Sequence, residues 1–144
     1  MKKLPISLLM GLFSILGFSQ EKVFTTDEGA IRGYDPIAYF VDQKPVKGSN
    51  DYTYEWKDAT WHFSSTKNLE KFKSDPEKFA PQFGGYCAYG MSNGYKAKTE
   101  PDAWTIVNDK LYLNYNVDVR TKWKENLDER IEKAQANWVM LENK

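Results

Sequence analysis

Residues Phe83–Tyr95 read FGGYCAYGMSNGY and contain the only cysteine of the chain, Cys87. The chain also has one histidine, His62, and Met91 follows Cys87 by four positions. Thiolate, imidazole and thioether are ligands that a soft transition metal prefers, so these three side chains predict a copper-like site if the fold brings them together. The glycines around Cys87 favour a loop, in which a spacing of four decides little. A structural zinc site needs four ligands, usually Cys and His, which the sequence does not supply.

Cys87 has two other interpretations. A catalytic cysteine needs a nearby base and an orienting group, and no sequence pattern links Cys87 to His62. A buried thiol that packs as a small apolar residue is the default, as is a gap-filling role for Met91. His62 alternates with Trp61 and Phe63, which also fits an ordinary histidine in a strand. We therefore expect a packed Cys87 and a protein that is not an enzyme, with cysteine catalysis as the third-ranked alternative.

A metal-free binding loop is the remaining interpretation of the glycine-rich stretch. Its glycines let the backbone approach a ligand closely, and aromatic side chains offer stacking faces with polar tips. Asp35 could take part in acid–base chemistry beside a tyrosine, or cap the turn before Pro36. No Gly-Lys-Ser/Thr follows the glycines, so the stretch does not resemble a phosphate-binding loop. The residues with ligand-binding potential are Tyr34, Asp35, Tyr86, Tyr89, Tyr95 and Trp104.

The N-terminus predicts export. Residues 1–20 begin with two lysines, continue with an apolar run and end with Gly17 and Ser19, which match the small residues of a signal-peptidase site. The run is shorter than the roughly 20 residues that span a bilayer, which disfavours the alternative of an uncleaved anchor. We expect a periplasmic or secreted protein that is not membrane-embedded after removal of the signal.

Composition narrows the partners. Removal of residues 1–20 takes away two of the 20 basic side chains and none of the 20 acidic ones, which leaves a net charge of −2. This balance provides no electrostatic footprint for nucleic acid or anionic lipid. A single cysteine excludes an intramolecular disulfide. The expected partner is a small ligand, a metal ion or another protein, and the only candidate cofactor is a soft transition metal such as copper.

The first half of the chain predicts short elements. Residues 21–32 are polar and predict a lead-in, and residues 37–41 (IAYFV) are typical of a strand. Segments 52–56 and 59–63 flank a two-residue connection and predict a hairpin. Ser64 and Ser65 are good N-caps for a helix that ends near Ser74, and Asp75-Pro76 starts another helical turn.

The second half predicts a second hairpin, residues 104–107 and 110–115, which pair around Asn108-Asp109. Asn116 or Asp118 caps a last helix over residues 119–141, in which apolar residues recur every three or four positions. The sequence thus predicts an α+β fold in which a small antiparallel sheet with hairpins packs against helices and a long amphipathic helix ends the chain.

Three segments resemble the YHS domain family. They are GYDPIAYF at 33–40, YEWKDATWHFSSTKNLEKFKSDPEKFAP at 54–81, and YGMSNGYKAKTEPDAWTIVNDKLYLNYN at 89–116. The first two are similar to the core of the family, and the third is similar to the extension of stand-alone exported members. The resemblance implies one YHS-like domain over residues 33–144.

The resemblance also implies a metal function, because members attached to metal-transport proteins are thought to bind heavy metals through cysteines. One of these cysteines follows the Asp-Pro pair and two flank the start of the helix. The matching positions here are Ala38, Ser64 and Asn68, and none is a cysteine. We therefore expect an exported binding module, associated with a metal by family resemblance or, alternatively, a metal-free module that binds a small molecule or protein through residues 83–95.

Overall fold

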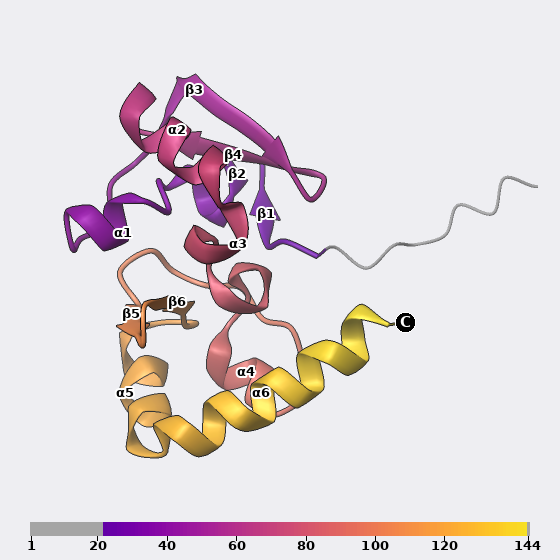
Figure 1. The fold of residues 1–144 in the computed structure, drawn as a ribbon. Helices are drawn as coiled ribbons and strands as arrows, with labels where there is room; N and C mark the ends of the chain where they lie inside the picture. The colour runs from indigo at the N-terminus through magenta and orange to yellow at the C-terminus, as the bar shows by residue number, and fades with distance from the viewer. Residues whose placement is uncertain (1–21, 144) are drawn as a thin grey trace, which may run out of the picture.

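The computed structural model describes residues 22–143 and shows the predicted α+β fold. The signal peptide predicted for residues 1–20 lies outside the described residues. Figure 1 shows two halves, an upper one built around the hairpin β3–β4 and a lower one that contains the long C-terminal helix. Each of the sheets in the described part of the chain has two antiparallel strands.

The N-terminal segment packs more closely than a polar lead-in would. It forms β1 (Thr25–Thr26), β2 (Gly29–Ala30) and a 3-10 turn η1 (Ile31–Gly33). Val23, Ala30 and Ile31 are buried in the first hydrophobic core. Most residues of the segment are polar, so its composition did not predict that these three apolar residues are buried.

The segment predicted as a strand, residues 37–41, is instead the short helix α1 (Ala38–Val41). The reason is local. The Asp35 carboxylate accepts hydrogen bonds from the backbone N–H groups of Ile37 and Ala38, at 2.8 and 3.3 Å, and so satisfies donors at the start of the helix. The strand prediction for this segment was wrong because this capping outweighs the strand preference of the IAYFV residues.

The first hairpin and the helices after it follow the prediction. β3 (Ser49–Trp56) pairs with β4 (Ala59–Phe63), α2 (Thr66–Ser74) begins after the N-cap Ser65, and α3 (Pro76–Phe79) follows the N-cap Asp75. Phe72 of α2 lies at the centre of the first core. Its ring lies within 6.2 Å, between centroids, of four aromatic rings, those of Tyr54, Trp56, Trp61 and Phe63.

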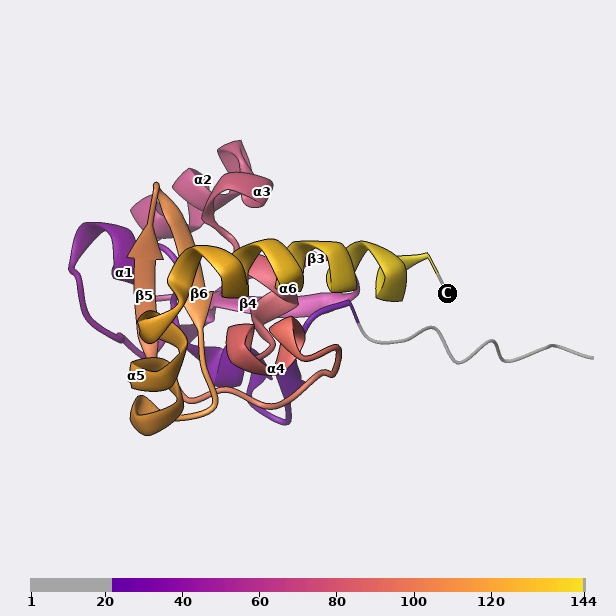
Figure 2. The ribbon, with the colours of Figure 1, turned by 90° about the horizontal axis from the view of Figure 1, so that it is seen from below.

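The second half begins with a 3-10 turn, η2 (Gln82–Gly85), and the helix α4 (Ala88–Ser92). The second hairpin consists of β5 (Trp104–Val107) and β6 (Lys110–Leu113). The predicted single helix over residues 119–141 is divided into α5 (Val117–Glu125) and α6 (Leu127–Glu142), because Asn126 has non-helical φ and ψ of −134° and 51°. Figure 2 shows α6 lying across α4.

Strand β6 separates two hydrophobic cores. Successive side chains of a strand point to opposite faces. Leu111 and Leu113 belong to the first core, whereas Tyr112 belongs to the second, where its ring centroid lies 5.3 Å from that of Trp123. Strand β6 therefore contributes side chains to the cores of both halves.

Candidate functional site

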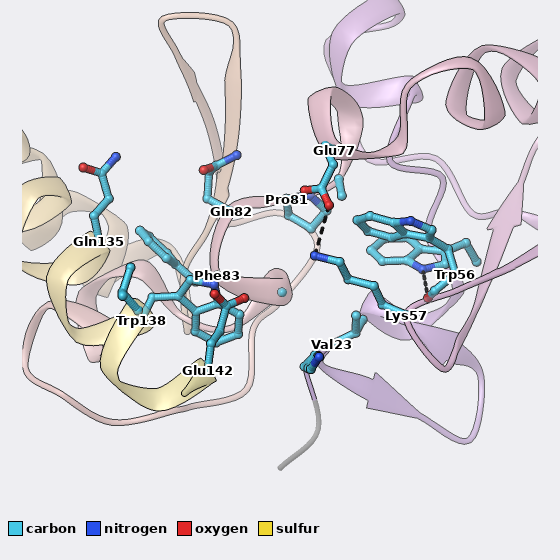
Figure 3. Close-up of a pocket in the computed structure, with 15 residues that line it drawn as sticks. Val23, Trp56, Lys57, Glu77, Pro81, Gln82, Phe83, Gln135, Trp138 and Glu142 are labelled. Carbon is cyan, nitrogen blue, oxygen red and sulfur yellow. Dashed lines mark hydrogen bonds and ion pairs between the residues drawn. The ribbon is translucent and has the colours of Figure 1, made fainter. Parts of the chain in front are cut away.

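A cleft of about 410 Å³ opens between the two halves (Figure 3). Trp56 of the first hairpin lies on one side, and Phe83 of η2 and Trp138 of α6 lie on the other. Trp61 of the same hairpin also lines the cleft. Volumes of roughly 300–1,000 Å³ are typical of small-molecule sites. The cleft therefore has the size of a small-ligand site.

On one side of the cleft lies a lysine, Lys57, whose backbone conformation is unusual for its residue type. Lys57 and Asp58 form the turn of the β3–β4 hairpin with φ of 50° and 58°, values that favour Gly, Asn or Asp. The ammonium of Lys57 lies 4.7 Å from the Trp56 ring centroid and 3.2 Å from the Glu77 carboxylate. The fold therefore holds a lysine at a turn position that does not favour it, with its charge at the mouth of the cleft.

The opposite side of the cleft combines packed aromatic rings with the polar ends of side chains. Phe83 is almost fully buried, and its ring centroid lies 6.3 Å from that of Trp138, so the second core holds both rings in place. Gln82, Gln135 and Glu142 also line the cleft, where amide and carboxylate groups can donate or accept hydrogen bonds.

The charges that line the cleft balance. Lys22 and Lys57 are opposed by Glu77 and Glu142. Since Lys57 is already paired with Glu77, the cleft has no excess of either sign to attract an ion. Its chemistry suits a neutral ligand that has one apolar face and several hydrogen-bonding groups.

Cys87 lies elsewhere and is buried, with 1% of its surface exposed. Its sulfur caps α4, accepting the N–H of Gly90 at 3.4 Å and that of Tyr115 at 3.2 Å, and it donates to Oδ1 of Asn114 at 3.5 Å. Burial raises the pKa of this thiol, against a smaller opposing effect of the backbone N–H groups. A neutral, enclosed thiol matches the packed interpretation.

The structure gives the other two predicted metal ligands different neighbours. Met91 is fully buried in the second core. The stretch that was expected to be a loop contains the helix α4, so Met91 lies one helical turn after Cys87. His62 is on β4, with its ring against Gly29. Among residues 22–143, no group of three or more His, Cys, Asp or Glu side chains is placed to hold a metal ion. The copper-like site of Cys87, His62 and Met91 stays a prediction.

The predicted ligand-binding aromatics do not line the cleft. Tyr86 is buried near Phe24, Tyr95 is 52% exposed, and Trp104 is half-buried against Tyr39. Two more are covered by cations at 4.3–5.0 Å from the ring centroid, Tyr89 by Arg130 and Tyr34 by Lys47. Their role in binding stays a prediction, although Phe83 and Gly84 at the start of the glycine-rich stretch do line the cleft.

Sequence reasoning missed the other cleft residues, notably Trp56, Lys57, Glu77 and Trp138. They come from the first hairpin, α3 and α6, so no local spacing indicates their convergence. One signal was available. A lysine occupies the first position of the two-residue turn at 57–58, where the second hairpin has Asn108, and this departure from turn preference marks Lys57.

Asp35 forms a second polar centre, in the first half. Its carboxylate is fully buried and accepts hydrogen bonds from α1, from the end of β4 and from α2. The donors on the latter two elements are the backbone N–H and hydroxyl of Ser64, at 2.8 and 2.7 Å, and Nδ2 of Asn68, at 2.8 Å. Asp35 thus ties three elements together.

The protein thus has a small α+β fold with a cleft between its two halves. The model of the YHS domain family matches residues 37–83, and the chain thus contains a YHS domain, which extends from just before α1 to η2. No curated protein and no solved structure matches the chain. Among residues 22–143, no helix combines the length and apolar character needed to cross a bilayer.

Proposed function

We propose that this protein is a non-catalytic binding module whose ligand occupies the cleft between the YHS domain and the C-terminal half. The observation that carries the proposal is the convergence of Trp56 and Lys57 from one half with Phe83 and Trp138 from the other around about 410 Å³. The metal-free interpretation of the sequence is favoured over the copper interpretation, because Cys87 is enclosed and its pKa is raised.

The lining groups favour a small neutral molecule with a ring. A ring can pack on the indole of Trp56 or Trp138, while hydroxyl or amide groups meet the ends of Gln82, Gln135 and Lys57. The balanced charges disfavour a strongly ionic ligand, because a buried charge needs a partner.

The test uses nicotinamide and N-acetylglucosamine as neutral ring-bearing probes. Each is titrated into the ¹⁵N-labelled protein, and shifts of backbone and indole N–H signals are recorded. We expect the largest shifts at Trp56, Lys57, Phe83 and Trp138. Shifts confined to residues outside the cleft, with either probe, would show that the ligand site lies elsewhere.

Two variants with matched controls sharpen the test. Lys57→Ala and Gln135→Ala each remove a polar group of the cleft, whereas Lys110→Ala and Glu132→Ala change exposed residues of the other hairpin and of the same helix. We expect the two cleft variants to weaken probe binding about three- to tenfold, the loss of one hydrogen bond, and the controls to bind like the wild type.

A further inference from the structure

The positions that correspond to the family's cysteines converge on one carboxylate. The N–H of Ala38 donates to Oδ1 of Asp35 at 3.3 Å, next to the N–H of Ile37 at 2.8 Å. Ser64 donates both its N–H and its hydroxyl to Oδ2, and Asn68 donates its side-chain N–H to the same oxygen. Ala38 is distant in the sequence from Ser64 and Asn68, and all three positions meet at a single buried anion.

The polarity of this centre is opposite to that of a metal site. A carboxylate has about four lone-pair positions, and Asp35 accepts five hydrogen bonds in this structure. Each neighbour presents the positive end of an N–H or O–H dipole toward the carboxylate. No oxygen lone pair remains directed at a cation, and the surrounding dipoles repel one.

The neighbouring side chains cannot act as metal ligands in this arrangement. The hydroxyl of Ser64 donates to Asp35, and Asn68 must turn its amide nitrogen inward because a carboxylate oxygen only accepts. Ala38 contributes no side-chain donor atom. The residues present do not fit the metal that the family implies.

We infer that the three positions at which metal-binding YHS domains have cysteines do not hold a metal ion in this chain and instead donate hydrogen bonds to the Asp35 carboxylate. An internal anion with peptide and side-chain donors joins α1, the end of β4 and α2, and it does so without a metal. This YHS domain therefore reaches its full stability in the absence of metal. The hydrogen bonds of Asp35 do not involve the cleft between the two halves, whatever ligand binds there.

The first experiment measures what the anion contributes. Asp35→Asn keeps the size of the side chain but turns an NH₂ group toward donors, and we expect Tm to fall by roughly 10 °C or more. Asp51→Asn, on the exposed part of β3, is the control and should leave Tm within about 2 °C of the wild type. An unchanged Tm for Asp35→Asn would overturn the inference, whereas failure of this variant to fold supports it.

The second experiment tests the metal directly on the wild-type protein. Tm is measured after exhaustive chelation and after addition of Zn(II) or Cu(I), and metal binding is followed by competition with a chromogenic chelator. We expect the same Tm in all samples and no binding that depends on Ser64 or Asn68. Stoichiometric binding that is lost in Ser64→Ala or Asn68→Ala would overturn the inference. Binding that is lost only in Cys87→Ser would leave the Asp35 centre metal-free, as inferred.

Discussion

The sulfur of Cys87 lies 3.2 Å from the backbone nitrogen of Tyr115, and this contact ties the start of α4 to the chain that leaves β6. The same sulfur donates to Asn114, whose Oδ1 also accepts the N–H of Tyr89 at 3.0 Å. The only thiol of the chain is therefore part of a junction between two elements of the second half.

Cys87 should be protected from alkylation in the folded protein. Its sulfur is enclosed and burial raises its pKa, so both access and the thiolate fraction are low. At pH 8 we expect iodoacetamide to label the native protein at least about 100-fold more slowly than the urea-unfolded protein. Mass spectrometry of timed samples checks this ratio. Equal rates would show that Cys87 is accessible and reactive.

The free energy of unfolding should decrease at alkaline pH. Burial raises the pKa of both Cys87 and Tyr39 in the folded state, so each group is held neutral there. Their contribution to stability is fully present below the unfolded pKa values, about 8.5 and 10, and is lost as pH rises toward the higher folded values. Urea titrations from pH 7 to 11 measure this decrease.

Cys87→Ser separates the thiol from the tyrosines, because serine does not titrate in this range. In this variant the decrease should start near pH 10 instead of near pH 8.5, since burial raises the pKa of both Tyr39 and Tyr112. A wild-type stability that increases between pH 8.5 and 11 would contradict the assignment for the thiol and for the tyrosines.

Lys57→Asn should stabilise the fold and weaken binding in the cleft. Lys57 has a φ of 50° at a turn position where asparagine is favoured, so the substitution should raise the free energy of unfolding by about 0.5–1 kcal/mol. It also removes the cation beside Trp56 and Glu77. Urea unfolding and the nicotinamide titration measure the two effects. Asn108→Lys, the reciprocal change at the other hairpin, should only destabilise.

Gly84→Ala should detach the N-terminal segment from the second half. A Cβ at Gly84 would lie 1.9 Å from the carbonyl oxygen of Lys22, and the N–H of Phe24 donates to the Gly84 carbonyl at 2.8 Å. We expect a loss of about 3 kcal/mol or more. Gly94→Ala is the matched control, because its φ of 88° is also positive but its Cβ would make only an ordinary contact, at 3.9 Å, with Nδ2 of Asn137. It should cost about 1 kcal/mol from backbone strain alone.

Phe72→Ala should be among the most destabilising substitutions in the first core. The ring of Phe72 is fully buried among four other aromatic rings, and its loss leaves a cavity that they cannot fill. We expect a loss of about 3–5 kcal/mol. Lys73→Ala, the next residue on α2 and exposed, should change stability by less than about 0.5 kcal/mol.

The parts of the fold that sequence predicted correctly are those determined by neighbouring residues. Ser65 accepts the N–H of Asn68 and starts α2, and Asp75 with Pro76 starts α3, as the capping patterns indicate. The strand predicted for residues 37–41 is the helix α1, because the Asp35 carboxylate caps the turn that follows it. Contacts with Ser64 and Asn68, far along the chain, place this carboxylate. Local preference has no access to that partner.

The site was harder to predict than the fold, for the same reason. The cleft joins Trp56, Glu77, Phe83 and Trp138, which share no spacing because their meeting depends on how the two halves pack. The apolar stripe of residues 119–141 correctly predicted a core-facing helix, but its period does not show the break at Asn126.

Strand β6 makes the two halves thermodynamically inseparable. Its four residues supply Leu111 and Leu113 to one core and Tyr112 to the other, so neither core can open without removing side chains from both. We therefore expect unfolding in one cooperative transition, with coincident signals from Trp61 and Trp123. Residues 37–83, which the YHS family defines, lack this strand, and as an isolated fragment they should not fold.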